Sequence, residues 1–354
     1  NPPYIQLQKM GTDADALQKM NYETYERTGD IYCLFYEMGM KLLKPGALLS
    51  FITSNKWMRA NYGKSLREHL SSKYNPTLLI DFANNKIFDS ATVLVNILSL
   101  EKCGNQGHTI SCSVEDGFDV SKLSDYVQTH AVFSCFSHSE SWSILSDIER
   151  SIKAKIEAVG TPLKDWDIQI NYGIKTGFND AFIIDSVRRN EILNACQSED
   201  ERQKTAEIIR PILRGRDIKR YCYEWAELYI IATFPSRQYD IDNYPTLKEF
   251  LLSFGIERLE QTGKEYIIDG EIVKARKKTS NRWFETQDSI SYWDEFSKPK
   301  IIYPNMTKFL PFAYDTSGLV TNQKCFIITG KRLAFLTAFL NSSLFKFCFA
   351  DKFP

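Results

Sequence analysis

Asn1-Pro2-Pro3-Tyr4 opens the chain, and this turn decides how the segments after it are interpreted. Each proline fixes its φ angle and lacks a backbone N–H, so the turn is rigid and its carbonyl groups point outward. Asn1 adds a side-chain carbonyl that accepts hydrogen bonds, and Tyr4 adds a flat aromatic face. The same four residues also fit an ordinary turn or a polyproline segment, because Asn-Pro marks turns.

The turn suits one difficult substrate, an amine conjugated to a planar ring. Such a nitrogen is a poor nucleophile because its lone pair is delocalised into the ring. The Asn1 side-chain carbonyl and the Pro2 backbone carbonyl can each accept one N–H of the amine, which frees the lone pair. Tyr4 can then stack on a base that has left its duplex. The motif therefore indicates methyl transfer to an exocyclic amine without a charged base.

Helices and strands alternate after the turn. A helix is predicted over residues 25–43, and its expected buried face consists of Ile31, Phe35, Met38 and Leu42. Lys44-Pro45-Gly46 ends this helix. Apolar segments predict strands at 47–53, 78–82 and 92–100, with a helix over 63–72. This order is half of an open α/β sheet, and such sheets place their sites at the carboxyl ends of the strands.

Several blocks in one order carry a family resemblance. They are Asn1-Pro2-Pro3-Tyr4, residues 42–52, Ser54-Asn55-Lys56-Trp57, Ile87-Phe88-Asp89, residues 172–177, residues 212–218 and Lys300-Ile301-Ile302-Tyr303. Together they resemble the adenine-specific DNA methyltransferases of the TaqI-like group, which includes the type IIG restriction-modification enzymes. The resemblance covers nearly the whole chain. It implies an α/β fold in which the C-terminal half of a Rossmann-like class I methyltransferase sheet precedes an α+β target-recognition domain.

The resemblance also implies roles for individual residues. Asn1 and Pro2 hold the adenine amine, Pro3 completes the catalytic turn, and Tyr4 stacks on the flipped base. The family usually adds a second aromatic residue on the other face of the base. The aligned position is Leu100 and the nearest aromatic residue is Phe88, so both are candidates, and a core position for Phe88 is an equal alternative.

The family binds S-adenosyl-L-methionine at a Gly-rich strand-to-helix turn, followed by an acidic residue after the next strand. This sequence has no such segment, because its glycines are scattered and no Gly-x-Gly run precedes a helix. We therefore expect that the rest of a longer parent polypeptide supplies the cofactor site. We also expect that the chain does not methylate DNA by itself.

Composition sets wider limits. The chain has 354 residues, of which 43% are hydrophobic, so it can form two domains with ordinary cores. Lys and Arg number 44, as do Asp and Glu, so a DNA surface has to come from local clustering of charge. Eight dispersed Cys without C-x-x-C, together with four His, favour neither zinc nor disulfides and fit a reduced, cytoplasmic protein. We expect no membrane segment, because no run of 18 apolar residues occurs.

Changes in composition divide the chain into three expected parts. Residues 1–103 form the catalytic half, 104–160 a connector, and 161–354 a target-recognition domain for double-stranded DNA. The connector includes an expected helix over 141–158, for which simple core packing is the favoured interpretation. Its apolar stripe consists of Trp142, Leu145, Ile148, Ile152 and Ile156.

Three segments of the third part are candidates for DNA contact. The first is a basic loop before Trp283 with five cations, Lys274, Arg276, Lys277, Lys278 and Arg282. The second has glycine between Arg214 and Arg216, which lets guanidinium groups reach phosphates or a guanine edge. The third places Lys175 between two glycines whose N–H groups can approach a phosphate. The respective alternatives are a solvated face, pairing of Arg216 and of Asp217 with neighbouring residues that holds the fold, and a tight turn.

Two other functions stay open. A methyltransferase acting on a protein glutamine amide can use the same motif, but such enzymes normally end soon after the catalytic block. The chain can also act only as a DNA-binding specificity module. No Asp followed by Glu-x-Lys occurs in a strand context, so we expect any restriction nuclease centre upstream. The favoured expectation is direct methyl transfer to adenine, without a metal or a covalent enzyme intermediate, in a restriction-modification system.

Overall fold

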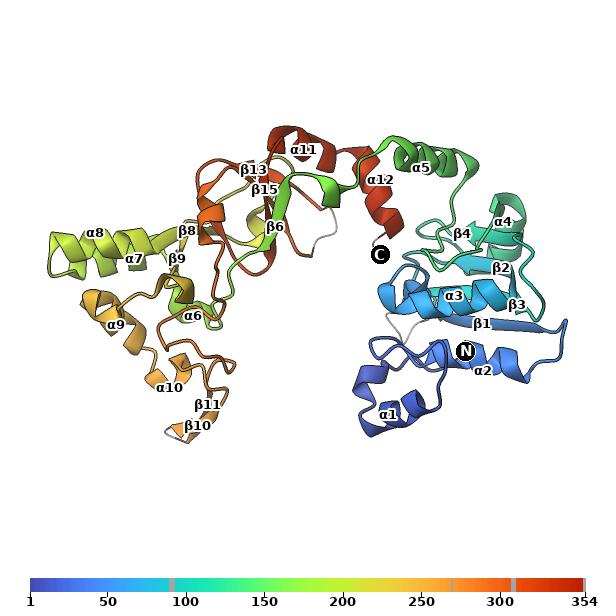
Figure 1. Ribbon diagram of the computed structural model, residues 1–354, viewed down its shortest axis with the longest axis horizontal. Helices are drawn as coiled ribbons and strands as arrows, with labels where there is room; N and C mark the ends of the chain where they lie inside the picture. Colours follow the sequence, from blue (N-terminus) through green and yellow to red (C-terminus); the bar gives the residue numbers. More distant parts are fainter. Residues whose placement is uncertain (89–92, 269, 307–309, 353–354) are drawn as a thin grey trace. The chain divides into compact units, whose positions relative to one another are not determined.

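The computed structural model describes residues 1–88, 93–268, 270–306 and 310–352. The chain divides into two compact units, and in Figure 1 residues 1–160 run from blue to green and residues 161–346 from green to red. Unit 1 contains residues 1–160 and the residues from 347 onward, and unit 2 contains residues 161–346. Asp89 of the family resemblance and the first residue of the strand expected at 92–100 lie outside the described residues.

Unit 1 is a layered α/β structure. Its helices are α1 (Thr12–Lys19), α2 (Tyr32–Leu42), α3 (Lys64–Lys73), α4 (Leu123–His130) and α5 (Asp147–Val159). Its strands are β1 (Leu48–Ser54), β2 (Asn75–Asp81), β3 (Val95–Glu101), β4 (Thr109–Ser113) and β5 (Val132–Ser134). Helices α2 and α3 pack against one face of the sheet, and α4 packs against the other.

The strands of unit 1 form one sheet in the order β1-β3-β2-β4-β5. Strand β3 pairs antiparallel with both β1 and β2, so β1 and β2 run in the same direction. Strand β4 pairs parallel with β2, and β5 pairs antiparallel with β4. The carboxyl ends of β1 and β2 therefore lie at the same edge of the sheet, and this edge positions the site.

Helix α2 buries a different face from the one expected. Tyr32, Tyr36 and Met40 are fully buried, whereas the predicted face of Phe35, Met38 and Leu42 is 38–78% exposed. Both sets have helical spacing, because this helix is apolar around most of its circumference. The predicted face was wrong, since the sheet covers the side that carries the two tyrosines.

The sheet of unit 1 continues beyond residue 103, although the sequence predicts a connector from residue 104. Strands β4 and β5 extend the sheet, so residues 109–134 contribute to the same layer as β2. Trp142 also belongs to the core of unit 1, because its ring lies 5.3 Å from that of Trp57 and 4.7 Å from that of Phe136.

Helix α5 differs from the packed helix that we expected. It begins at Asp147, after a capping box between Ser146 and Glu149. It buries no residue, and Ile148 of its predicted stripe is 75% exposed. The expected core role was wrong for Ile148 and Ile152, which are exposed, whereas Trp142 precedes the helix and does lie in the core of unit 1.

In its described residues, unit 2 has two four-stranded sheets, a two-stranded hairpin and several helices. Its strands are β6 (Ile168–Tyr172), β7 (Ile183–Asp185), β8 (Ile209–Leu213), β9 (Leu228–Ile231), β10 (Glu265–Ile268), β11 (Glu271–Lys274), β12 (Lys300–Pro304), β13 (Ala313–Asp315), β14 (Val320–Thr321) and β15 (Cys325–Gly330). Its helices are α6 (Asn179–Phe182), α7 (Ser186–Ala195), α8 (Glu199–Ile208), α9 (Pro245–Leu252), α10 (Ile256–Leu259), α11 (Leu333–Leu340) and the start of α12 (Ser343–Lys352).

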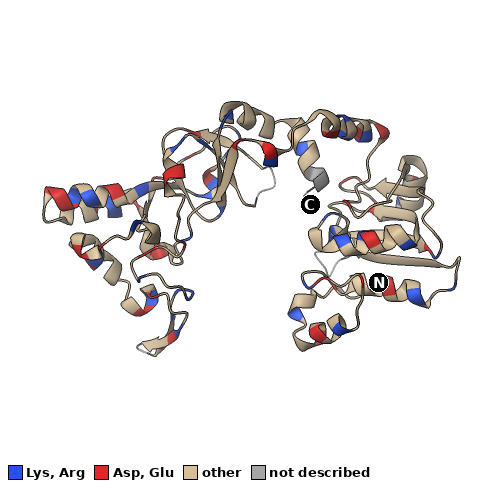
Figure 2. Ribbon diagram, in the orientation of Figure 1, with Lys and Arg blue, Asp and Glu red and all other residues tan. Residues whose placement is uncertain are grey.

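The sheets of unit 2 share one core. The strand orders are β13-β12-β15-β6 and β14-β8-β9-β7. Ile212 and Ile230 of the second sheet belong to the same buried cluster as Ile302 and Ile327 of the first. Figure 2 shows acidic and basic residues interspersed on α7 and α8, as is typical of a solvated surface.

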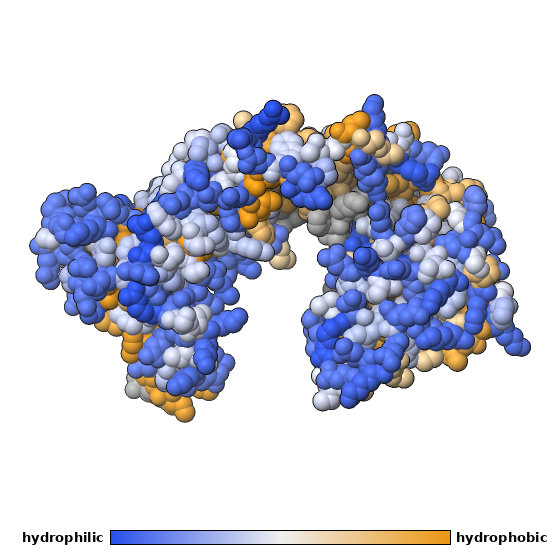
Figure 3. Space-filling model, in the orientation of Figure 1, coloured by the Kyte–Doolittle hydropathy of each residue, from blue (hydrophilic) through white to orange (hydrophobic). Residues whose placement is uncertain are grey.

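Strands β10 and β11 form a separate hairpin with little burial. Ile267 and Ile272 of this hairpin are exposed, and Figure 3 shows apolar atoms at this tip of unit 2. Among the helices in the described ranges, none is long and apolar enough to cross a membrane.

A buried ion pair joins two strands of unit 2. Lys300 Nζ on β12 lies 2.5 Å from Asp315 Oδ2 on β13, and both side chains are fully buried. Lys300 also donates to the Phe296 carbonyl (2.7 Å), and the Tyr223 hydroxyl donates to Asp315 (3.1 Å). Burial lowers the pKa of Lys300, although Asp315 opposes this shift. Because both charges have close partners, the pair fixes the register of β12 and β13.

Lys300→Met is expected to destabilise unit 2 by about 3–5 kcal/mol, because it leaves the Asp315 carboxylate buried without its cation. Urea unfolding followed by tryptophan fluorescence measures this loss. The combination of Lys300→Met with Asp315→Leu should recover much of the stability, since no buried charge then remains. Lys298→Met, which removes an exposed lysine on the same segment, is the control. An equal loss for both single variants would contradict the assignment.

Candidate functional site

The Asn1-Pro2-Pro3-Tyr4 turn lies against strand β1. Pro2 is buried and Asn1 is exposed, so the rigid part of the turn packs inward while the amide faces solvent. The Tyr4 hydroxyl lies 2.8 Å from Asn1 Oδ1, to which it donates, and 3.2 Å from the Ile52 carbonyl of β1. The tyrosine therefore links the amide of the motif to the sheet.

The segment after the turn is held by the start of helix α2. The Ile31 N–H donates to the Ile5 carbonyl, and the Leu7 N–H donates to the Gly29 carbonyl, each at 2.9 Å. A Cβ on Gly29 would lie only 3.1 Å from the Tyr62 ring, so glycine permits this close approach. The motif is thus fixed on one side by β1 and on the other by the residues that lead into α2.

Tyrosine rings surround the buried side of the turn. The edge of the Tyr4 ring packs against Tyr32, with centroids 6.1 Å apart and planes at 77°. The hydroxyl groups of Tyr32 and Tyr62 are hydrogen bonded at 2.9 Å. Burial raises the pKa of Tyr4, which keeps its hydroxyl protonated as a donor to Asn1 near neutral pH.

A buried polar network supports the carboxyl end of β1. The Thr53 hydroxyl and the Trp57 indole N–H both donate to Asn96 Oδ1, at 3.1 and 3.2 Å. The Tyr36 hydroxyl lies 3.0 Å from the Thr53 hydroxyl. Because the network joins α2, β1 and β3, it fixes the strand end to which Tyr4 is bonded. The sequence analysis missed Asn96, although an asparagine in the middle of an apolar strand signals a buried hydrogen bond.

A second polar cluster lies at the same edge of the sheet, where β2 ends. Asn55 donates to Asp81 Oδ1 (2.9 Å), as does the backbone N–H of Ala83 (3.0 Å). Arg59 Nη2 lies 3.7 Å from Asp81 Oδ2. These contacts bring the ends of β1 and β2 together and complete the frame around the motif. Within the described ranges, no group of three or more His, Cys, Asp or Glu is placed to hold a metal ion.

The structure separates the two base-stacking candidates. Leu100 is fully buried in the core beneath α2 and α3, and its register partner is Leu49 at the amino end of β1. Since the motif contacts β1 near its carboxyl end, Leu100 lies at the opposite edge of the sheet, and its stacking role was wrong. Phe88 is partly buried and packs against the cluster that contains Phe82, which favours its interpretation as a core residue.

Arg276, in the basic loop of unit 2, has a structural role. Its side chain is 4% exposed, and its guanidinium donates to the carbonyl groups of Leu259, Thr176, Glu285 and Trp283. Burial lowers the pKa of Arg276 to about 10. Its predicted contact with DNA was therefore wrong, because four of its five N–H groups are bonded to carbonyl groups of the protein and the residue is almost fully buried.

The other cations of this loop divide into paired and unpaired residues. Lys274 forms an ion pair with Glu265 (2.8 Å) across the hairpin, and Arg282 Nη2 lies 2.7 Å from Glu285. Lys277 and Lys278 are exposed and have no ion pair in the described part of the chain. Only these two lysines of the loop remain as unpaired candidates for DNA contact.

The second and third candidate segments also contain structural contacts. Arg214 donates hydrogen bonds to the Asp217 carboxylate from Nε and Nη2, whereas Arg216 is exposed. The ion pair of Asp217 within this segment is therefore with Arg214. Burial opposes the ionised form of Asp217, but the bonds from Arg214 hold its pKa below the usual range.

A Cβ on Gly173, in the third candidate segment, would lie 1.9 Å from the Asn322 carbonyl, so this glycine permits backbone packing. Lys175 remains partly exposed beside it.

Two segments of the chain match known protein families. Residues 1–88 match the family model of the Eco57I restriction-modification methylase, and residues 210–354 match that of the TaqI-like C-terminal specificity domain. The chain is therefore similar to restriction-modification methylases over its first 88 residues and to TaqI-like specificity domains over residues 210–354.

Type II methyltransferases are among the curated relatives. M.BstVI of Geobacillus stearothermophilus is 23% identical over 98% of the chain, and M.XhoI of Xanthomonas vasicola is 21% identical over 93%. The chain spans 61% and 59% of the lengths of these proteins. A solved structure of the type IIL restriction-modification enzyme MmeI in complex with DNA matches 99% of the chain and 42% of that protein, with a TM-score of 0.54 at 11% identity. This last similarity shows the fold.

Arg276→Met is expected to destabilise unit 2 by about 3 kcal/mol or more, because it leaves several buried carbonyl groups without a donor. Lys278→Met, two residues away on the exposed side of the same loop, is expected to change the stability little. Thermal and urea unfolding compare the two variants. A stable Arg276→Met protein would contradict the structural role.

Proposed function

We propose that the whole protein is a site-specific DNA methyltransferase of a restriction-modification system. It transfers a methyl group from S-adenosyl-L-methionine to the exocyclic amine of a flipped adenine. The observation that carries the proposal is the Asn1-Pro2-Pro3-Tyr4 turn, tied to the carboxyl edge of an α/β sheet within the segment that matches a restriction-modification methylase. The TaqI-like specificity domain in the same chain supports DNA as the substrate.

The sheet supports a Rossmann-like class I methyltransferase fold for unit 1. Strands β1 and β2 run parallel, and helices cover both faces. Strand β1 pairs only with β3 among the described residues, so its other edge is open to a further strand. We infer that the strands of the cofactor-binding part pair along this free side of β1, next to the motif.

Asn1 can bind the amine while it remains bonded to Tyr4. Its Oδ1 accepts the Tyr4 hydroxyl, and a carbonyl oxygen has a second lone pair for an N–H of adenine. The Pro2 carbonyl accepts the other N–H. The two oxygens then stabilise the positive charge that develops on the nitrogen as it is methylated. S-adenosyl-L-methionine would supply an electrophilic methyl group when it is bound. The nitrogen of adenine would form the new N–C bond as the S–C bond breaks, S-adenosyl-L-homocysteine would leave, and the methylated amine would release a proton to solvent, so no covalent enzyme intermediate is needed.

Tyr4 combines two tasks in this proposal. Its hydroxyl orients the Asn1 amide, and its ring is fixed by Tyr32 and by the bond to the Ile52 carbonyl. A fixed ring offers the flipped base a stacking surface at a small cost in conformational entropy. The ring and the hydroxyl therefore make separable contributions.

Asn1→Ala in the whole protein is expected to lower methyl transfer at least about 100-fold, because one preorganised acceptor is lost. The assay follows labelled methyl groups from S-adenosyl-L-methionine into unmethylated bacterial DNA and identifies the methylated base after hydrolysis. Asn194→Ala, at an exposed position of α7 in unit 2, is the control and should retain activity. Label in protein, or activity that is indifferent to Asn1, would reject the proposal.

Tyr4→Phe and Tyr4→Ala separate the hydroxyl from the ring. Tyr4→Ala removes stacking that is worth about 1–3 kcal/mol per base, so kcat/KM should fall about 5- to 150-fold. Tyr4→Phe keeps the ring and should retain most of the base flipping, reported by 2-aminopurine at the target position. If the two variants have equal base flipping, Tyr4 does not stack on the base.

A further inference from the structure

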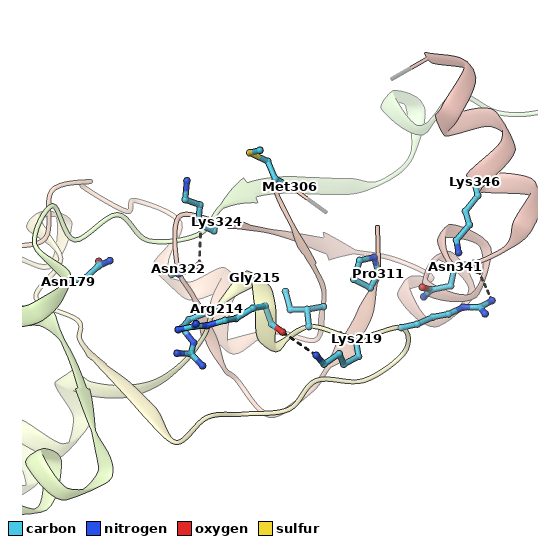
Figure 4. Close-up of a pocket in the computed structure, with 13 residues that line it drawn as sticks. Asn179, Arg214, Gly215, Lys219, Met306, Pro311, Asn322, Lys324, Asn341 and Lys346 are labelled. Atoms are coloured by element: carbon cyan, nitrogen blue, oxygen red, sulfur yellow. Dashed lines mark hydrogen bonds between the residues drawn. The ribbon is translucent and has the colours of Figure 1, made fainter. Parts of the chain in front are cut away.

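A cavity of about 790 Å³ lies within unit 2, and every charged residue that lines it is a cation. Figure 4 shows lining residues from the start of α6, the loop after β8, the segment between β12 and β13, the turn between β14 and β15, the end of α11 and the first part of α12. The cations are Arg214, Arg216, Lys219, Arg220, Lys324 and Lys346. Three asparagines contribute further polar groups, Asn179, Asn322 and Asn341.

This concentration of one sign of charge contrasts with the rest of the chain. The whole sequence has 44 basic and 44 acidic residues, yet none of the described residues that line this cavity carries a carboxylate. On α7 and α8 of the same unit, both signs are interspersed. Like charges in a concave surface focus the electric field, so the cavity attracts anions more strongly than a flat surface with the same residues.

Arg214 supports the cavity rather than acting as a free cation. Its guanidinium lies 2.8 Å from Asp217, whose side chain is buried, and its backbone N–H donates to the same carboxylate. The pair closes a short turn over Gly215–Asp217. A Cβ on Gly215 would lie 3.2 Å from the Lys324 carbonyl, so glycine lets this turn approach the start of β15. The loop therefore has a fixed position.

The remaining cations are available to a ligand. Arg216, Lys324 and Lys346 are exposed and form no ion pair in the parts of the chain that the structure describes. The charge of Arg216 helps to lower the pKa of Asp217, but the ion pair of Asp217 is with Arg214. Lys219 lies 3.8 Å from Glu224, a loose pair between two exposed groups. Arg220 donates to the Asn341 carbonyl (2.8 Å), which leaves its other donors free.

Asn341 gives this side of the cavity a rigid support. Its side chain accepts the Phe312 N–H (3.2 Å) and donates to the carbonyl groups of Phe312 (2.8 Å) and Thr337 (2.9 Å). The Asn341 backbone carbonyl also accepts the hydrogen bond from Arg220 and so orients it. Asn341, whose own side chain is fully hydrogen bonded to neighbouring backbone groups, therefore supports the cations of the loop after β8 and of α12. A preorganised array loses little conformational entropy when it binds.

We propose that this cavity binds the phosphate backbone of the duplex DNA that the specificity domain recognises. The inference rests on the proposed function, and it names the surface that holds the DNA. Guanidinium and ammonium groups at a fixed spacing match phosphate oxygens, whereas contacts of this kind carry no base information. The cavity positions the duplex, and base recognition belongs to other side chains of the unit.

The cavity has more unpaired cations than the basic loop that the sequence emphasised. In the loop, Lys277 and Lys278 are the two lysines without an ion pair among the described residues. Around the cavity, three exposed cations lack such a partner, and Arg220 is held by a backbone carbonyl rather than by an acid. Lys324 and Lys346 are isolated in the sequence, so only the fold brings them together with Arg216.

The test is salt-dependent DNA binding by the 354-residue chain. Fluorescence anisotropy with a labelled duplex gives Kd at several salt concentrations for the wild type and for a variant with Arg216→Gln, Lys324→Gln and Lys346→Gln. A control variant carries Lys164→Gln, Lys204→Gln and Lys331→Gln, which removes three exposed charges of unit 2 outside the cavity. Circular dichroism and thermal unfolding confirm that both variants are folded.

The cavity variant should bind DNA more weakly and lower the slope of log Kd against log salt by about 3, since each phosphate contact contributes about 0.9. The control should keep the wild-type slope. Equal slopes for the two variants would overturn the inference, as would a wild-type chain with no salt-dependent binding.

Competition with inorganic phosphate distinguishes a backbone site from a site for free phosphate. Millimolar phosphate at constant ionic strength should leave duplex binding unchanged. Displacement of the duplex from the wild type but not from the cavity variant would identify a free-phosphate site and overturn the proposal. Because the readout is binding, it is independent of methyl transfer. If DNA binding depends on the cavity but the whole protein does not methylate DNA, the proposed function is rejected and the inference about the cavity stands.

Discussion

The antiparallel insertion of β3 between β1 and β2 is the constraint on which the candidate catalytic site depends. Because β3 runs against both neighbours, β1 and β2 end at the same edge of the sheet. At this edge, Tyr4 reaches the Ile52 carbonyl, and Asn55 reaches Asp81. The network around Asn96 then connects β3 with β1 and α2. The motif therefore has a rigid support that spans three elements of the sheet layer.

Unit 2 uses its charged residues in two different ways. Some are buried or paired and hold the fold: Lys300 with Asp315, Arg214 with Asp217, and Arg276 with four carbonyl groups. Others are exposed and lack an acidic partner in the described chain, and several of these line one cavity. Burying a cation destabilises the protein unless its N–H donors are hydrogen bonded. A basic residue whose donors are bonded within the protein therefore has few donors available for a ligand.

The sequence predicted the order of elements well because apolar periodicity and turn residues are local properties. The strands expected near 47–53 and 78–82 and the helix expected at 63–72 correspond to β1, β2 and α3 with small shifts at their ends. The buried face of α2 was wrong because the helix is apolar on both sides, and only the sheet decides which side is covered. Leu100 was misplaced for a related reason, since the direction of β3 is set by its partners.

What the sequence by itself determined is the Asn1-Pro2-Pro3-Tyr4 motif and the order of two segments, one similar to a restriction-modification methylase and one similar to a TaqI-like specificity domain, because such patterns consist of contiguous residues. Only the tertiary structure decided which cations are free. Arg276 and Lys277 are neighbours in the sequence, yet one is enclosed by carbonyl groups and the other is exposed. Arg216, Lys324 and Lys346 are distant in the sequence, yet they line one cavity. Solvent access and charge pairing depend on what packs nearby in space, and a linear pattern does not contain that information.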